Sequence, residues 1–162
     1  MTESSVLNKL SELGQSVWYD NISRELIQDG QLAEIVSSGV KGLTSNPSIF
    51  EKAVASSSIY DSDISNFNHG DVSDIDVYEA IAITDIRSAA DVLMSQYQLT
   101  NGENGFVSLE VNPHLANDTD ATIREARRLF IDVDRPNLMI KVPGTKAGIP
   151  AIETLISEGI NV

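Results

Sequence analysis

Short apolar runs alternate with helical segments along the chain, and this order constrains the fold more than any other feature. The runs at 15–20, 40–45, 106–111 and 137–142 are short and rich in β-branched, aromatic or aliphatic residues, so they are predicted to be strands. Residues with helical spacing follow each of them. This alternation favours parallel β/α units joined by right-handed crossovers, and the sequence therefore predicts an α/β protein.

Caps and apolar spacing predict where the helices lie. Residues 51–101 are expected to form a helical insertion between the second and third strands. Short helices or a mobile stretch would reach residue 68, and a long helix capped by Ser73 or Asp76 would follow. Further helices are expected before Gly14, after Ser23 as one helix or as two broken at Asp29-Gly30, from Pro47, at 119–130 behind Asp118 or Thr119, and at 147–158 before Gly159.

Composition excludes several classes of protein. The 162 residues, 41% of them hydrophobic, suit one domain with a packed core. The net charge of -13 and the lack of a Lys/Arg block argue against a nucleic-acid surface, and the absence of cysteine excludes disulfides and thiolate metal sites. No signal segment and no apolar stretch of roughly 18 residues occurs, so a cytoplasmic protein without a membrane span is expected. His69 and His114 stand alone in polar turns and are interpreted as surface residues rather than metal ligands.

Each predicted strand ends in polar residues. In α/β sheets and barrels, reactive groups gather at the carboxyl ends of the strands. Because side chains two residues apart share a face of a strand, a sheet with its aliphatic residues toward the helices would turn the polar ones toward one interior. The polar residues at these ends are Asp20, Thr44, Asn46, Ser108, Glu110 and Lys141.

Simpler roles remain open for these residues. Glu110 could lie on an exposed edge or form a salt bridge with Lys141, and Lys141 could be a surface lysine whose stem lies along apolar neighbours. The remaining alternatives are helix caps: Asp20 could cap the following helix, and Thr44, Ser45 or Asn46 could cap the helix that begins at Pro47.

A buried lysine at a strand end also has a chemical use. Desolvation disfavours the ammonium form, so that the neutral amine of Lys141 could attack a ketone or aldehyde and form a Schiff base. Glu110, directly or through one water, is the candidate acid and base for the proton transfers. Asp20 could remove a substrate hydroxyl proton as a carbon–carbon bond breaks. The iminium would accept the electrons, so this chemistry requires no metal.

Four segments resemble the successive strand blocks of transaldolase: QSVWYDNISREL, GLTSNPSIF, VSLEVNPHLANDT and NLMIKVPGTKAGIPAIETLISEGINV. They occur in the same order and cover the chain from about residue 15 to its end. The first block is similar to that of longer bacterial transaldolases, including those fused to a glucose-6-phosphate isomerase. The resemblance implies a (β/α)8 TIM barrel, of which residues 1–162 would form the N-terminal half with about the first four β/α units.

The resemblance also implies roles for the polar strand ends. Lys141 would be the Schiff-base lysine, Glu110 the acid/base acting through a water, and Asp20 the acid/base for aldol cleavage. Thr44 and Asn46, together with Ser108, would hold the water or the substrate. The family moves a dihydroxyacetone unit from a ketose phosphate, such as fructose 6-phosphate or sedoheptulose 7-phosphate, to an aldose phosphate such as erythrose 4-phosphate or glyceraldehyde 3-phosphate. It works in the pentose phosphate pathway without a cofactor.

The chain departs from the family pattern in its length. A TIM barrel typically needs about 250 residues, and the family residues on the fifth and later strands that support the site and bind phosphate have no counterpart here. Residues 160–162 look like the first residues of a fifth strand. We therefore expect either a shortened chain or a part of a longer protein. Pairing with a second copy, or with the missing C-terminal half, would cover its sheet edges and its apolar face.

Two other hypotheses remain open. A lysine aldolase similar to fructose-6-phosphate aldolase would use the same Schiff base but release free dihydroxyacetone. The Glu110 and Asn46 blocks and the 51–101 insertion favour transaldolase over such compact aldolases. The chain could also be a catalytically silent half-barrel that self-associates.

Overall fold

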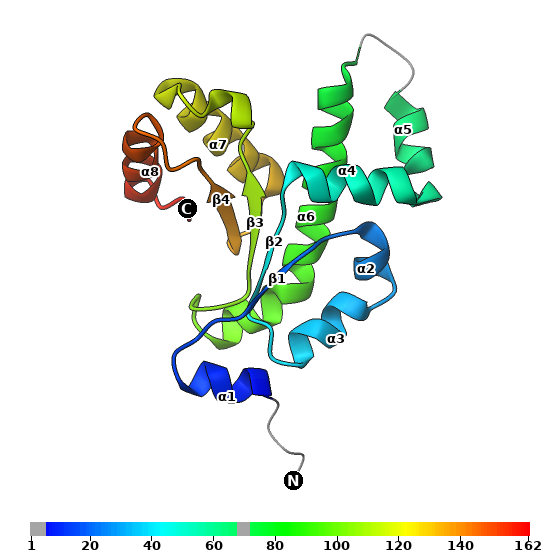
Figure 1. Ribbon diagram of the computed structural model, residues 1–162, viewed down its shortest axis with the longest axis vertical. Coiled ribbons are helices and arrows are strands. Elements are labelled where there is room, and N and C mark those ends of the chain that lie inside the picture. Colours follow the sequence, from blue (N-terminus) through cyan, green and yellow to red (C-terminus); the bar gives the residue numbers. More distant parts are fainter. Residues whose placement is uncertain (1–5, 68–71) are drawn as a thin grey trace.

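Four parallel strands in sequential order form the only sheet among the residues that the computed structural model describes, which are 6–67 and 72–162 (Figure 1). Each strand lies inside its predicted range, and the four are β1 (Trp18–Asp20), β2 (Gly42–Thr44), β3 (Phe106–Glu110) and β4 (Leu138–Lys141). All neighbours pair in parallel, with Asp20 opposite Thr44 and Glu110 opposite Lys141. The predicted parallel α/β class is confirmed.

Helices make every crossover between these strands. Two helices, α2 (Arg24–Gln28) and α3 (Gln31–Ser37), connect β1 to β2. The break falls at Asp29-Gly30, where Gly30 has a φ of 79°, a left-handed conformation that glycine adopts without steric cost. The alternative with two short helices is therefore correct, and Ser23 caps the first of them by accepting the Leu26 N–H.

Helices make up most of the described segment between β2 and β3. It contains α4 (Pro47–Ser56), the 3-10 turn η1 (Ser58–Tyr60), α5 (Asp61–Phe67) and the long α6 (Asp74–Leu99). Ser73 is the N-cap of α6: its hydroxyl accepts the Asp76 N–H, and the Asp76 carboxylate accepts the Ser73 N–H. Both predicted residues therefore take part in one capping box.

The bounds of the remaining helices agree with those predicted from the sequence to within a few residues. Asp118 is the N-cap of α7 (Thr119–Val133), which runs three residues beyond the predicted end at 130. Asp134 then ends the helix in the left-handed region, with a φ of 51°. The remaining elements are α1 (Val6–Glu12), the 3-10 turn η2 (Pro113–Leu115) and α8 (Gly148–Ser157).

The hydrophobic core lies between the sheet and its helices. Val107 and Leu109 of β3 and Leu138 and Ile140 of β4 are buried on this face, as the predicted alternation requires. They pack against α6 and α7, which contribute Ala82, Ile86, Ala89, Ala90, Leu93, Ala126, Leu129 and Val133.

The opposite face of the sheet is only partly covered. Trp18 and Met139 on this face are half-buried, and Asp20 is exposed. The Trp18 ring lies across Gly42 so closely that a Cβ at that glycine would come within 2.5 Å of the ring. In the described ranges, no helix is long and apolar enough to cross a membrane.

The last residues of the chain lie on the outer edge of β4. The Ile140 N–H donates to the Asn161 carbonyl at 2.8 Å, and the Asn161 side-chain amide donates to the Leu138 carbonyl at 2.9 Å. Residues 160–162 themselves form no strand, contrary to the sequence interpretation, although one backbone hydrogen bond of a parallel ladder is present.

Candidate active site

Lys141 and Glu110 lie side by side at the carboxyl ends of β4 and β3. The Lys141 Nζ donates to the Glu110 Oε2 at 3.2 Å and to the Ser45 backbone carbonyl at 3.0 Å. The second acceptor lies directly after β2, so the ammonium spans three neighbouring strand ends. The predicted salt bridge of Glu110 with Lys141 is confirmed. The exposed-edge alternative for Glu110 is wrong, because β3 pairs with a strand on each side.

The end of β1 is joined to the end of β2 by a second polar contact. The Thr44 Oγ1 donates to the Asp20 Oδ1 at 2.5 Å. Asp20 is not the cap of the next helix, since Ser23 fills that place. Thr44 is not a helix cap either, and its hydroxyl orients the Asp20 carboxylate instead.

Ser45 and Ser108 connect the two inner strands. The Ser45 Oγ is buried and donates to the Ser108 carbonyl at 2.7 Å, so Ser45 does not cap α4. The Ser108 side chain is 3% exposed, and its Oγ has no hydrogen-bond partner among the described residues. A buried hydroxyl usually finds a partner, so this oxygen is suited to bind a water or a ligand atom.

Asn46 has a structural role in the described chain. Its Oδ1 accepts the Ile49 N–H at 3.0 Å and caps α4, whose first residue is Pro47. The capping interpretation of Asn46 is therefore confirmed. The side-chain amide nitrogen is not used by this cap, and the side chain is half-buried beside the Ser45 carbonyl that Lys141 contacts.

Lys141 is more exposed than the buried lysine considered in the sequence analysis. The Lys141 side chain is 41% exposed and that of Glu110 is 26% exposed. The four strands thus place the ammonium in a polar cluster without enclosing it, so Lys141 is less buried in this chain than the Schiff-base hypothesis expected.

A cavity of about 630 Å³ borders Glu110 on the helical side, between the start of α6 and α7. Tyr78 and Arg128 line it, but Lys141 does not. Burial, with the Glu110 charge as a smaller contribution, raises the pKa of Tyr78 to about 12, so its phenol stays protonated. Glu79 holds Arg128 in an ion pair with both guanidinium Nη atoms.

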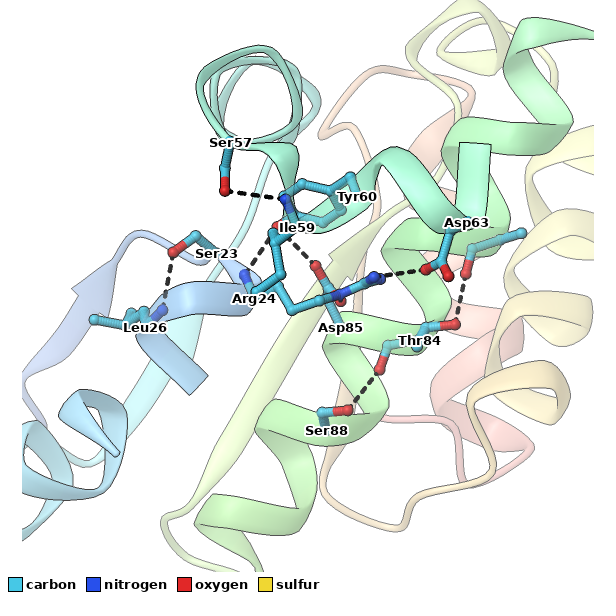
Figure 2. Close-up of polar contacts among 11 residues, drawn as sticks. Ser23, Arg24, Leu26, Ser57, Ile59, Tyr60, Asp63, Thr84, Asp85 and Ser88 are labelled. Carbon is cyan, nitrogen blue, oxygen red and sulfur yellow. Dashed lines mark hydrogen bonds and ion pairs between the residues drawn. The ribbon is translucent and has the colours of Figure 1, made fainter. Parts of the chain in front are cut away.

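A buried charged cluster near β1 was missed by the sequence interpretation (Figure 2). The Arg24 Nε donates to the Asp85 Oδ1 at 2.8 Å, and its Nη1 donates to the Asp63 Oδ2 at 2.5 Å. The Tyr60 hydroxyl donates to the Asp85 Oδ2 at 3.0 Å and accepts the Arg24 backbone N–H at 2.8 Å. Arg24 is 9% exposed, Asp85 1% and Tyr60 0%. We call Arg24, Tyr60, Asp63 and Asp85 the arginine cluster.

Burial and ion pairing shift pKa values in the arginine cluster. It raises the pKa of Tyr60 to about 12. Burial opposes the charge on Arg24, but the hydrogen bonds and charges of Asp85 and Asp63 outweigh it and raise the pKa of the guanidinium. Asp85 carried one sequence signal: it lies on the apolar stripe of α6, four residues from both Ile81 and Ala89.

No site for a metal ion is formed by the described His, Asp and Glu side chains. His114 is exposed, as predicted, and His69 lies outside the described residues.

Comparisons with known proteins agree with this geometry. The family model described as Transaldolase/Fructose-6-phosphate aldolase matches residues 17–162. Transaldolase 2 of Nostoc sp. (strain PCC 7120 / SAG 25.82 / UTEX 2576) is 49% identical over 157 residues, which are 96% of this chain and 41% of the relative. Transaldolases of Neisseria gonorrhoeae and Thiobacillus denitrificans are 47% and 49% identical over 98% of this chain, and over 45% and 44% of their own lengths.

The chain thus spans less than half the length of these relatives. Its four parallel strands in sequential order form about half of the TIM barrel that the family adopts. The matching family model and the ordered strand ends lead to one conclusion: the chain belongs to the transaldolase/fructose-6-phosphate aldolase family.

Proposed function

We propose that the protein to which this chain contributes transfers a dihydroxyacetone unit from a ketose phosphate to an aldose phosphate through a Schiff base on Lys141. The observation that carries this proposal is the 3.2 Å contact between the Lys141 Nζ and the Glu110 carboxylate at adjacent strand ends. The relatives named transaldolase support it. Such a reaction belongs to the pentose phosphate pathway.

Imine formation needs an amine and a proton carrier. The Lys141 ammonium first gives up a proton, and its nitrogen then attacks the carbonyl carbon of the ketose to form a carbinolamine. Protonation of the carbinolamine hydroxyl releases water and leaves the iminium. Glu110, close enough to act directly or through one water, carries these protons.

Asp20 is proposed to act in the cleavage step. It takes the proton from the substrate hydroxyl on the carbon that leaves, and the adjacent carbon–carbon bond breaks. The bonding electrons move into the iminium to give an enamine, and an aldose phosphate departs. The hydrogen bond from Thr44 fixes the Asp20 oxygen that is not needed for this transfer. Addition to a second aldose phosphate and hydrolysis of the imine complete the cycle.

Thr44, Asn46 and Ser108 are proposed to hold the water or the substrate. The buried and unpaired Ser108 Oγ is the strongest case, since it needs a partner that the described residues do not supply. For Asn46 the available group is the side-chain nitrogen, because the oxygen caps α4.

Reductive trapping tests the proposal directly. The chain is incubated with fructose 6-phosphate and borohydride, and the adduct is located by intact mass spectrometry and peptide mapping. We expect modification of Lys141, whereas Lys146, five positions along the sequence, serves as an internal control for random glycation. Equal modification of both lysines, or no modification of either, would reject imine chemistry for this chain. Lys141→Arg retains the positive charge and should abolish the adduct.

Asp20→Ala separates the two chemical steps. The trapped adduct at Lys141 should persist, whereas release of the aldose phosphate should slow by about 100-fold or more, as for loss of a general base. If the variant loses both the adduct and cleavage, Asp20 acts before the carbon–carbon bond breaks and its proposed role is wrong.

A second candidate is an aldolase that releases free dihydroxyacetone, because the description of the matching family includes fructose-6-phosphate aldolase. Turnover without an added aldose phosphate acceptor, with free dihydroxyacetone as product, would identify that activity. A chain that forms a stable dimer and no adduct would instead fit the silent half-barrel.

A further inference from the structure

A short link joins the proposed acid/base Asp20 to the arginine cluster. Asp20 ends β1, and only residues 21–23 separate it from Arg24, the first residue of α2. Among the described strands, β1 pairs only with β2, over three residues. Thr44 is the only described residue whose side chain forms a hydrogen bond with the Asp20 carboxylate. The position of this carboxylate therefore depends on how the chain is held directly after β1.

Part of the helical insertion between β2 and β3 contacts the start of α2 (Figure 2). The Tyr60 hydroxyl accepts the Arg24 backbone N–H at 2.8 Å, and the Asp63 carboxylate accepts the Arg24 Nη1 at 2.5 Å. The Ser57 hydroxyl donates to the Glu25 Oε1 at 2.5 Å. The partners in these three contacts are 32 to 39 residues apart in the sequence. The insertion is thus tied to the chain that follows Asp20.

Tyr60 is the member of this set that acts on the main chain. It is 0% exposed, and its hydroxyl also donates to the Asp85 Oδ2 at 3.0 Å, which fixes the direction of the oxygen. Ile22 in the link is equally buried, but a cavity of about 360 Å³ borders residues 21–23. Packing therefore leaves room for the link to shift, and the hydrogen bond from Arg24 to Tyr60 limits that movement.

We propose that Tyr60 is a positioning residue for Asp20: its hydroxyl holds the backbone of Arg24 and thereby keeps the Asp20 carboxylate beside Thr44 at the end of β1. The inference rests on the proposed function, which gives Asp20 a substrate hydroxyl to deprotonate. A general base must lie within hydrogen-bond reach of the proton that it removes, and a misplacement of about 1 Å can slow a reaction about 100-fold. The helical insertion thus serves the cleavage step as well as the stability of the fold.

Tyr60→Phe tests this role, because it removes the hydroxyl and keeps the ring. In the borohydride assay with fructose 6-phosphate, the adduct at Lys141 should form at the original rate. Release of the aldose phosphate should slow about tenfold, because the base is displaced. The control is Val133→Ala, since Val133 is fully buried at the end of α7 and its truncation lowers stability outside the insertion. Both rates should stay unchanged in this control.

A double variant separates positioning from a general loss of stability. Because Tyr60 acts through Asp20, adding Tyr60→Phe to Asp20→Ala should slow release no further: the group that Tyr60 positions is already absent. A further slowing of about tenfold in the double variant would overturn the proposal. An unchanged release in Tyr60→Phe alone would overturn it as well.

Hydrogen exchange and NMR distinguish failure of this inference from failure of the proposed function. If the chain forms no adduct at Lys141, the proposed function is rejected for it, and both methods still measure the link. In Tyr60→Phe, the amides of residues 21–24 should exchange about fivefold faster than in Val133→Ala, which is destabilised without losing this hydrogen bond. The NMR signals of Asp20 and Thr44 should shift only in Tyr60→Phe. If these signals do not move in that variant, Tyr60 does not position Asp20, whatever the activity of the chain.

Discussion

Two charged clusters lie on opposite sides of the sheet and differ in how completely the chain surrounds them. Arg24, Tyr60 and Asp85 of the arginine cluster are buried, with Asp85 only 1% exposed, whereas the Asp63 side chain is 36% exposed. Lys141 and Glu110 contact each other on the other face, with side chains 41% and 26% exposed. Similar ion pairs are therefore buried in one place and open to solvent in the other.

The difference in burial indicates which ion pairs stabilise the fold and which can react with a substrate. A buried pair has lost its hydration and depends on its partners, so removing one partner leaves an uncompensated charge. An open pair remains hydrated and contributes little to folding, but its groups can still meet a substrate. We infer that the buried pairs on the helical side stabilise the fold, whereas the Lys141–Glu110 pair on the other side stays accessible to a substrate.

The largest effect is expected from Asp85→Ala. It leaves the Arg24 guanidinium buried without its main partner, and the free energy of unfolding should fall by about 3–5 kcal/mol. Urea unfolding followed by circular dichroism measures this loss. The control is Asp91→Ala, because Asp91 lies on α6 like Asp85 but forms its ion pair with Arg135 at the surface. This variant should have little effect on the free energy of unfolding. Equal losses of unfolding free energy in both variants would show that the buried and the exposed ion pairs stabilise the fold to the same extent.

Sequence reasoning located the polar strand ends because strand periodicity is local. Alternation alone placed Glu110 and Lys141 on the face opposite Leu109 and Ile140, and the structure agrees. Asn46 remained ambiguous, since an Asn before Pro47 fits both a cap and a substrate ligand. Only the hydrogen bond from the Ile49 N–H shows that the Asn46 side-chain oxygen is used as a cap.

The arginine cluster could not be predicted in the same way. Its partners come from distant parts of the chain: Arg24 is 61 residues from Asp85, and Tyr60 is 25 residues from it. Asp85 on an apolar helix stripe signalled a buried carboxylate, but nothing local identifies its partner. The exposure of Lys141 was also unpredictable, because it depends on which elements cover the open face of the sheet.

Tyr60→Phe should have the next largest effect. The change keeps the ring, whose centroid lies 4.6 Å from the Arg24 Cζ, but removes a hydroxyl that both donates to Asp85 and accepts from the Arg24 backbone. Two buried polar groups would lose a partner, at an expected cost of about 1–3 kcal/mol. Thermal unfolding measures it. A melting temperature equal to that of the original chain would mean that water replaces the hydroxyl and that the cluster is less enclosed than its contacts indicate.

Glu110→Gln should have a much smaller effect on stability. Because the pair with Lys141 is partly exposed, the expected change in the free energy of unfolding is about 0–1 kcal/mol. The same variant should slow imine formation at Lys141 in the borohydride assay, since the amide cannot carry the protons. If the variant lost much stability but formed the Lys141 adduct at the normal rate, Glu110 would have a structural role rather than a chemical one.

The smallest effect is expected from the surface pair of Asp91 and Arg135, and it should depend on pH. The Arg135 guanidinium donates to both Asp91 oxygens, at 2.5 and 3.0 Å, and holds the pKa of that carboxyl below its ordinary value of 3.8. The folded state therefore binds the proton less readily than the unfolded state. The stabilisation is present above 3.8 and is lost as the pH falls through the lower folded value. Urea unfolding of the original chain and of Arg135→Gln should show a small difference at neutral pH that disappears in acid and shrinks in high salt. A difference that survives both conditions would show that the pair acts through packing of the arginine stem rather than through charge.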